Sequence, residues 1–198
     1  MGDLNKYTNG SKIVLRKYSE IKLIVSRLRK QKKKIVLTQG SWDMIHIGHA
    51  RYLNIAKKHG DVLIVGVDSD HKIRKRKGPD RPIVPEKERI EMLTHLKSVD
   101  FVVLKQVRDP KWALIKAVRP DSLIVISENY SDSHLSDLKK LSKEVVVLPR
   151  QATTSTSAKL RLLQMGVTKK LGETIMPKIM GAIEEVFGSV EYKVKKRK

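Results

Sequence analysis

Residues 38–49 read TQGSWDMIHIGH, and the interpretation of the whole chain starts from this stretch. An apolar run from Ile35 to Leu37 leads into it, and a helical pattern from Ile47 to Lys58 follows it. This order predicts a strand, a glycine-containing turn and a helix that is entered at its N-terminus. Because the first N–H groups of a helix lack intrahelical partners and the helix dipole is positive there, the arrangement favours a bound phosphate.

Two histidines, His46 and His49, lie three residues apart at the start of this predicted helix. Residues at that spacing occupy neighbouring positions on one helical face, so both imidazoles can donate hydrogen bonds to the same phosphate chain. Gly48 lies between them, where a side chain would obstruct a ligand or a closely packed backbone. The stretch therefore has the features of a phosphate site with two histidine donors.

Short apolar runs alternate with helical patterns on either side of this stretch. The runs are rich in Val, Ile and Leu, as expected for parallel strands that are buried on both faces. They lie at residues 35–39, 62–67, 100–104, 122–126 and 144–148, with helical patterns at 47–58, 86–97, 110–118 and 133–142. The alternation predicts an α/β fold with a doubly wound, five-stranded parallel sheet, which binds its ligand outside the carboxyl ends of the strands.

Both ends of the chain are interpreted as additions to a central domain at residues 34–164. Residues 1–33 are a basic extension with one helix over 19–30, and the basic run from Arg29 to Lys34 is interpreted as a solvated linker. Residues 165–198 hold an amphipathic helix and a basic tail. We expect that last helix to dock on the core or at a dimer interface.

The net charge of +21 is concentrated at the two ends of the chain. Residues 1–34 carry 11 Lys and Arg against 2 Asp and Glu, and residues 165–198 carry 8 against 4. Such ends suit nucleic acid, an anionic membrane surface or solubility alone. The absence of cysteine excludes thiol nucleophiles and thiolate metal sites. No apolar run approaches the roughly 18 residues of a membrane span, so we expect a soluble, cytoplasmic protein.

The opening stretch resembles the G-x-F-D-x-x-H-x-G-H motif of the cytidylyltransferase-like nucleotidyltransferases, which have a Rossmann-like fold of the HIGH type. Trp42 stands where the family usually has Phe. The resemblance implies that His46 and His49 are catalytic. It also implies a set of nucleotide-binding residues in the same motif: Gly40, Ser41, Trp42, Asp43 and Gly48.

Residues 77–103 resemble the K-G-x-x-R-P-I-x-P…R…L…V-D-x-V-V segment of the heptose-1-phosphate adenylyltransferase branch. The resemblance implies that Lys77, on a mobile basic loop over residues 72–81, reaches the triphosphate and is catalytic. Any of the three preceding cations, Arg74, Lys75 or Arg76, could take its place. Arg89 is assigned to nucleotide binding, with a structural salt bridge as the alternative. Asp68 and Asp100 are assigned to the acceptor substrate.

Two later segments complete the resemblance. Residues 119–130 are similar to the family's R-P-D-x-L-x-x-x-G-x-x-Y, which assigns Tyr130 to the acceptor. Residues 126–129 lack the Lys-Gly-Gly-Asp of the heptose branch, so the identity of the acceptor stays open. Residues 148–159 resemble the R-x-x-x-I-S-T-T/S motif of glycerol-phosphate and choline-phosphate cytidylyltransferases, with Thr154 in place of Ile. This motif implies a catalytic Arg150 and a group of phosphate-binding hydroxyls: Ser155, Thr156 and Ser157.

Together these segments imply an enzyme that moves a nucleoside monophosphate from ATP or CTP to a phosphorylated small molecule and releases pyrophosphate. The family implies direct attack by the acceptor phosphate, without a covalent enzyme intermediate. Mg²⁺ is the implied cofactor, held mainly by the nucleotide phosphates, with Asp43 either as a ligand or as a structural residue. A homodimer is expected on family grounds.

Three other classes of protein share parts of this pattern. Archaeal-type FAD synthases share the first motif and a similar loop, so the acceptor could be a flavin. A non-catalytic protein could use the same fold to bind nucleic acid through its basic ends, although an aromatic content of 5% leaves little for base stacking. Class I aminoacyl-tRNA synthetases share the HIGH motif, but this chain is short and lacks a Lys-Met-Ser-Lys-Ser segment.

Overall fold

The computed structural model describes residues 13–15, 17–126, 128, 130–152 and 156–195, with the backbone alone for residues 13, 156–162 and 186–195. The chain divides into two compact units, Met1–Thr153 and Thr154–Lys198. The first unit contains the sheet and the predicted phosphate site, and the described part of the second consists of helix.

The first unit is built on a six-stranded sheet in which every pairing is parallel. The spatial order is β1-β4-β3-β2-β5-β6. The strands are β1 Ile13–Leu15, β2 Ile35–Gly40, β3 Val62–Asp68, β4 Phe101–Lys105, β5 Ser122–Ile126 and β6 Glu144–Leu148. Since β3 and β4 lie on one side of β2 while β5 and β6 lie on the other, the order reverses at β2. Its carboxyl end is therefore the switch point at which such sheets bind ligands.

The sheet has one strand more than the five that the sequence predicted. Strand β1 pairs with β4, in register from Ile13 beside Phe101 to Leu15 beside Val103. Its three apolar residues are too short a run to display a strand period, which explains why the pattern missed it. Strand β1 and the following helix make the described part of the N-terminal extension continuous with the central sheet.

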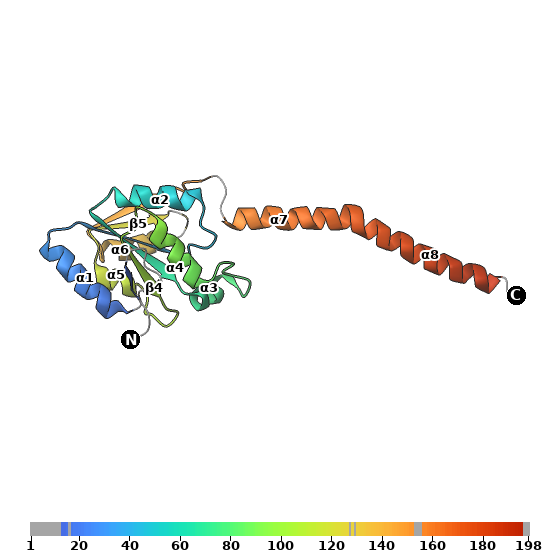
Figure 1. Cartoon of the computed structure of the whole chain (residues 1–198), viewed down its shortest axis with the longest axis horizontal. Coiled ribbons are helices and arrows are strands. Elements are labelled where there is room, and N and C mark those ends of the chain that lie inside the picture. Colours follow the sequence, from blue (N-terminus) through green and yellow to red (C-terminus); the bar gives the residue numbers. More distant parts are fainter. Residues whose placement is uncertain (1–12, 16, 127, 129, 153–155, 196–198) are drawn as a thin grey trace. The chain divides into compact units, whose positions relative to one another are not determined.

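Helices cover both faces of the sheet (Figure 1). One face is covered by α2 (Ile47–Lys57) and α4 (Glu86–His95), and the other by α1 (Tyr18–Lys30), α5 (Ala113–Val118) and α6 (Asp132–Lys139). Each face has its own buried apolar cluster, with the strands between them. The predicted N-terminal helix corresponds to α1, and its Ile21 and Val25 are buried in the second cluster.

The basic segment after β3, predicted as a loop, begins as helix α3 (Asp70–Lys77). The Ser69 hydroxyl caps the helix by accepting a hydrogen bond from the Lys72 N–H at 3.2 Å. Gly78, with a φ of 96°, ends it in a conformation that favours glycine. Asp70 in the first turn and four cations in the last turn, residues 74–77, complement the helix dipole. The sequence thus contained the signals for both ends of this helix, Ser69 and Gly78. The segment was nevertheless predicted as a loop because of its many charged residues.

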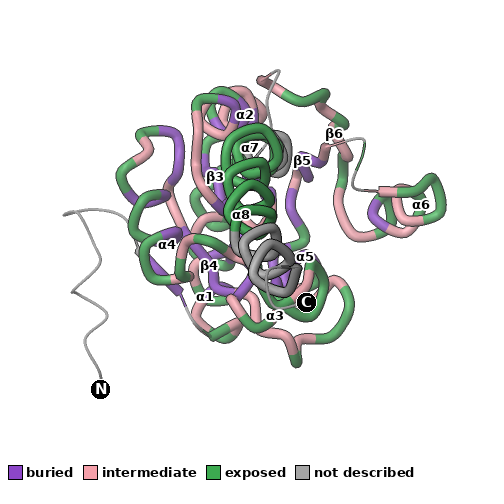
Figure 2. The backbone as a smooth tube through the Cα atoms, turned by 90° about the vertical axis from the view of Figure 1, so that its right-hand side faces the viewer, coloured by how far each residue is buried: buried purple, intermediate pink, exposed green. Residues whose placement is uncertain are grey.

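The second unit contains α7 (Thr156–Lys170), a π-helical segment (Leu171–Ile175) and α8 (Met176–Lys195). The π-helical segment lies directly before Pro177, which has no N–H to donate and so disturbs the regular hydrogen-bond ladder. Every side chain described between residues 163 and 185 is exposed, as Figure 2 shows for α7 and the first part of α8. Among the described helices, none is long and apolar enough to span a membrane.

Packing of α1 against the sheet predicts unequal effects for two substitutions on the same helix. Ile21 is fully buried, whereas Leu23 is 65% exposed. We expect Ile21→Ala to lower the free energy of unfolding by about 2–5 kcal/mol, because it removes buried methyl groups and leaves a cavity. Leu23→Ala is the matched control and should change it by less than about 0.5 kcal/mol. Urea unfolding measures both, and equal effects would show that α1 is not part of the core.

Candidate active site

The two predicted histidines lie where β2 ends and α2 begins. His46 is the N-cap of α2, in an extended conformation, and His49 is three residues further along the first turn. The centroids of the two rings are 4.2 Å apart, with 42° between the ring planes. The structure therefore places both imidazoles together at the carboxyl edge of the sheet, beside the positive end of a helix dipole.

Each histidine ring is oriented by a backbone N–H. The Nδ1 atom of His46 accepts a hydrogen bond from the Gly48 N–H at 3.1 Å, and the Nδ1 atom of His49 accepts one from the His46 N–H at 3.3 Å. A neutral imidazole that accepts at Nδ1 carries its proton on Nε2. Both rings are therefore held in the tautomer whose Nε2–H is a hydrogen-bond donor, as phosphate binding requires.

Gly48 has no room for a side chain. An added Cβ would lie 2.7 Å from Cβ of Ala152 and 2.8 Å from Cε1 of His46. Ala152 follows β6 and belongs to the motif at residues 148–159, so this close approach brings part of that motif against the opening motif. The predicted role of the glycine is thus supported by a specific packing constraint on the His46 ring.

Trp42 fixes the turn that precedes the histidines. Its backbone has a φ of 55°, a left-handed conformation that costs an ordinary residue about 1 kcal/mol. Burial of the indole, which is 5% exposed, and a hydrogen bond from its Nε1–H to the Gly66 carbonyl at 2.9 Å compensate for this cost. Its ring also contacts His49 edge-on, with a centroid separation of 5.6 Å. Trp42 therefore packs against His49 and helps to hold the histidine pair in place.

Asp43 ties the loop after α3 to this turn. Its carboxylate accepts hydrogen bonds from the N–H groups of Ile83 at 3.2 Å and Val84 at 3.0 Å, and pairs with Arg81 at 2.7 Å. The residue is 4% exposed. Because both carboxylate oxygens already have protein partners, these contacts favour the structural interpretation of Asp43 over a role as a metal ligand.

Arg89 lies beneath the site and is 1% exposed. Its guanidinium donates to the carbonyl of Val84 at 2.9 Å, to the carbonyl of Asp68 at 2.9 Å and to the carboxylate of Asp70 at 2.7 Å. It also donates to the carbonyl of Ser41. These contacts join the turn after β2, the end of β3 and the loop after α3. They correspond to the structural alternative that the sequence left open for this residue.

Asp68 ends β3 between two cations, Arg76, which the sequence offered as an alternative to Lys77, and Lys105, which the sequence assignment did not include. Lys105 pairs with one of its oxygens at 3.0 Å and Arg76 with the other at 3.0 Å, and Arg76 also donates to the Ser41 hydroxyl at 2.8 Å. Asp68 and Lys105 are register partners at the ends of β3 and β4. Their position as the last residues of adjacent parallel strands is the sequence signal that could have identified Lys105.

Two lysines at this edge of the sheet, Lys77 and Lys105, have a lowered pKa. Burial lowers the pKa of Lys105 below its ordinary value, although the Asp68 carboxylate opposes the shift. Lys77 is the last residue of α3, and desolvation followed by repulsion from Arg76 and Arg81 lowers its pKa as well. Anionic phosphate would relieve the repulsion among these cations. Lys77 and Arg76 are thus two cations of the predicted basic segment that lie beside the site.

The motif at residues 148–159 is only partly described. Arg150 pairs with Glu128, and both side chains are about half exposed. Ser155 lies outside the described residues. Thr156 and Ser157 open α7, but their side chains are not described. Their predicted contact with the triphosphate therefore stays a prediction.

The three residues assigned to the acceptor fall in different places. Asp68 and Tyr130 lie at the carboxyl edge, where the Tyr130 hydroxyl accepts a hydrogen bond from the Gln39 amide at 3.4 Å and burial raises its pKa. Asp100 precedes β4 and therefore lies at the opposite edge of the sheet. There it pairs with Lys57 at 2.5 Å and accepts a hydrogen bond from the Leu63 N–H. The structure does not bring Asp100 together with the other predicted residues.

The described residues include no group of three or more His, Asp or Glu side chains that could enclose a metal ion. The cations Arg76 and Lys77 at this edge, and the backbone N–H groups at the start of α2, suit phosphate oxygens. Chemically, the edge can bind a phosphate chain and stabilise negative charge that develops on it.

Comparison with known proteins identifies similar sequences. A family model described as cytidylyltransferase-like matches residues 37–195. The chain is 39% identical over 149 residues to the bifunctional protein HldE of a Nitratiruptor species, covering 74% of this chain and 32% of that protein. It is 37% identical over 159 residues to the HldE protein of Sulfurimonas denitrificans, covering 80% and 33%. The chain thus spans about a third of the length of these relatives.

The fold also has counterparts among solved structures. The lipopolysaccharide core biosynthesis protein from Thermoplasma volcanium matches with a TM-score of 0.52 and 30% sequence identity, covering 60% of this chain and 98% of that one. A pantoate-beta-alanine ligase from Francisella tularensis matches with a TM-score of 0.53 at 19% identity, covering 74% of this chain and 69% of that one, which indicates a shared fold.

The packing around Gly48 predicts a specific defect in ligand binding. Gly48→Ala should displace the His46 ring and weaken ATP or CTP binding by about 10–100-fold, the usual cost of a lost charge-assisted hydrogen bond. Gly166→Ala is the matched control, because nothing lies within 4 Å of the added Cβ there. Adding Ala152→Gly to Gly48→Ala removes one of the two close contacts and should restore part of the affinity. Calorimetric titration measures all three, and unchanged affinity in Gly48→Ala would contradict the packing argument.

Proposed function

The chain belongs to the cytidylyltransferase-like family of nucleotidyltransferases, and we propose that it transfers a nucleoside monophosphate from ATP or CTP to a sugar phosphate with release of pyrophosphate. ATP is the favoured donor, because residues 77–103 resemble the heptose-1-phosphate adenylyltransferase branch. The observation that carries the proposal is the histidine pair at the N-terminus of α2, whose Nδ1 atoms both accept backbone hydrogen bonds.

In the proposed reaction, a phosphate oxygen of the acceptor attacks the α-phosphorus of the triphosphate. A new oxygen–phosphorus bond forms, the bond between the α-phosphorus and the bridging oxygen breaks, and pyrophosphate leaves. The Nε2–H groups of His46 and His49 donate to phosphate oxygens whose negative charge increases in the transition state. No protein nucleophile is needed, so catalysis consists of positioning and charge stabilisation.

Cations around the histidines would neutralise the departing pyrophosphate. We assign this role to Lys77 and Arg150, as the family motifs imply, and add Arg76 because it lies against Ser41 and Asp68. Three hydroxyl residues would bind the β- and γ-phosphates: Ser155, Thr156 and Ser157. Mg²⁺ would be held mainly by the phosphates themselves, since the Asp43 oxygens have protein partners.

The acceptor would bind at the carboxyl ends of β3 and β5, beside Asp68 and Tyr130. Lys105 supports Asp68 from the neighbouring strand. Asp100 is left out of this assignment because it lies at the other edge of the sheet. A homodimer and a cytoplasmic location remain part of the proposal.

The donor and the acceptor can be identified by one assay. We expect pyrophosphate release with ATP or CTP only when a matching acceptor is present. The acceptors to test are heptose and hexose 1-phosphates, glycerol 3-phosphate, phosphocholine, phosphoethanolamine and FMN. Release with a sugar 1-phosphate supports the proposal, and release with FMN alone would favour flavin adenylyl transfer instead. Triphosphate binding without release across the panel would favour a non-catalytic role.

Removal of a histidine donor should slow the reaction strongly. We expect His49→Ala to lower kcat by about 10²–10³-fold, the usual effect of deleting one donor to the transition state. His59→Ala is the matched control, because His59 follows α2 at its other end and its carbonyl, not its ring, accepts the Ser122 hydroxyl. Steady-state pyrophosphate release measures both variants. Near-normal turnover in His49→Ala would refute the assignment of the histidine pair.

A further inference from the structure

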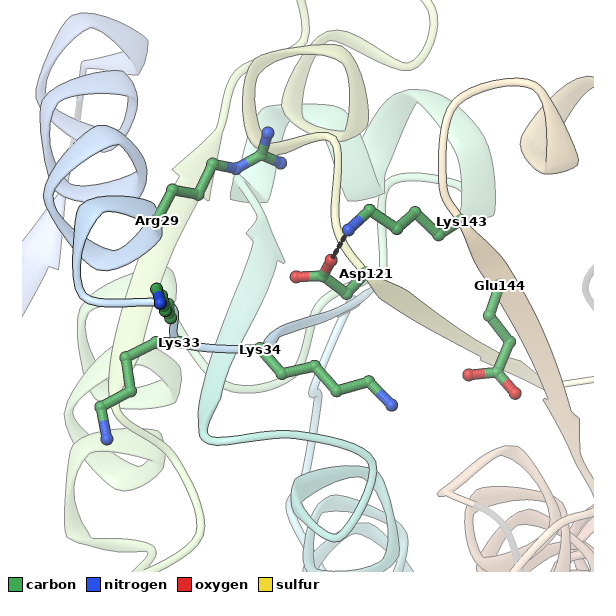
Figure 3. Close-up of a pocket in the computed structure, with 7 residues that line it drawn as sticks. Arg29, Lys33, Lys34, Asp121, Lys143 and Glu144 are labelled. Carbon is green, nitrogen blue, oxygen red and sulfur yellow. Dashed lines mark ion pairs between the residues drawn. The ribbon is translucent and has the colours of Figure 1, made fainter.

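A basic hollow of about 650 Å³ opens at the edge of the sheet opposite the histidines (Figure 3). It is lined by Arg29 in the last turn of α1, by Lys32–Lys34 after that helix, by Asp121 before β5, by Lys143 before β6 and by Glu144, the first residue of β6. The lining residues Lys34, Asp121 and Lys143 directly precede β2, β5 and β6, so the hollow lies at the amino edge of the sheet. A strand of six residues separates this edge from the candidate active site by about 20 Å, so the hollow is not part of that site.

Some of its charges have structural partners. Arg29 donates to the carbonyls of Val118 and Arg119, and so caps the C-terminus of α5. Lys143 pairs with Asp121 at 2.7 Å, and Asp121 also accepts the Ile35 N–H at 2.9 Å. These hydrogen bonds contribute to a pKa of Asp121 below its usual value, against the effect of burial. Arg29, Lys143 and Asp121 are therefore explained by the fold itself.

Three lysines on the rim are not explained in this way. The side chains of Lys32, Lys33 and Lys34 are exposed, and in the described part of the chain none of their ammonium groups has a hydrogen bond or an ion pair. Lys32 also has a φ of 57°, a conformation in which glycine or asparagine would be less strained. Three adjacent like charges repel one another, and a bound anion would offset that repulsion.

We propose that this hollow binds the phosphate backbone of a nucleic acid. The side chains of Lys33 and Lys34 leave the same segment in opposite directions, with Lys34 pointing toward Glu144 on the β6 side (Figure 3). Ammonium groups spread out in this way suit an extended anion with several phosphates rather than one small anion. The Glu144 carboxylate, an anion in the lining, accepts a hydrogen bond from the Ser122 hydroxyl at 3.0 Å and so has a partner within the protein. Lysines act as point charges toward phosphate and carry no sequence information.

The side chains that line the hollow argue against insertion into a membrane and against a protein interface with an apolar centre. The lining contains no apolar side chain to insert into a membrane or to form the centre of a protein interface. It contains no aromatic side chain on which a base could stack. The binding is therefore independent of sequence and depends steeply on salt, because each phosphate contact releases a counterion.

The test is the salt dependence of binding to a fluorescently labelled duplex of about 20 base pairs, followed by anisotropy between roughly 50 and 200 mM KCl. For the full chain, log Kd should vary linearly with log salt. Lys32→Gln/Lys33→Gln/Lys34→Gln should reduce the slope by about 3, roughly one for each lost phosphate contact. The matched control, Lys169→Gln/Lys170→Gln/Lys178→Gln, removes the same charge from exposed helix and should change the slope by less than about 1.

The outcomes separate this proposal from the enzymatic one. The Lys32→Gln/Lys33→Gln/Lys34→Gln variant should keep pyrophosphate release, since these lysines line the hollow at the amino edge of the sheet. No duplex binding by the full chain at the lowest salt concentration would overturn the proposal, as would equal loss of slope in the two variants. Binding to vesicles of phosphatidylserine and phosphatidylcholine without binding to the duplex would also overturn it. Duplex binding in the absence of any pyrophosphate release would support nucleic-acid binding by the hollow and would refute the proposed reaction.

Discussion

All described strands of the sheet run in the same direction, and this constraint positions both charged surfaces of the molecule. Parallel neighbours need crossover helices, so each of these helices starts at the carboxyl edge and ends at the amino edge. The positive end of α2 therefore meets the end of β2 at the histidine pair. The negative helix ends gather at the other edge, where Arg29 caps α5. The same arrangement thus produces an anion site at one edge and attracts cations to the other.

The fold could be predicted because the sequence patterns of its strands and helices are local and recur along the chain. Each central strand is a short run of Val, Ile and Leu between helical patterns, and the strand–turn–helix around His46 fixes which edge carries the site. Strand β1 was missed because three residues do not establish a period, and α3 because its charge resembled that of a solvated loop. Both errors concern short elements whose stability comes from what they pack against rather than from their own pattern.

The site could be predicted only in part, because side-chain partners are not visible in a one-dimensional pattern. The histidines and Gly48 followed from spacing. The engagement of Asp43 by Arg81, and the burial of Arg89 beneath the turn, depend on contacts between residues 38 to 48 positions apart. Lys105 ends a predicted strand as Asp68 does, but their pairing follows only from the register of β3 and β4. Asp100 was misplaced because a motif gives the order of residues along the chain, whereas its edge of the sheet follows from the direction of the strand.

The buried guanidinium of Arg89 has a consequence for how two ligands influence each other. It connects the Ser41 carbonyl, beside the histidines, to the Asp68 carbonyl at the end of β3. A ligand that orders either of these segments also restrains the other, which reduces the conformational entropy that a second ligand must remove. Binding at the two halves of the carboxyl edge is therefore expected to be cooperative without any movement of the sheet. Lysine, with one compact ammonium group, could not maintain this connection across several acceptors.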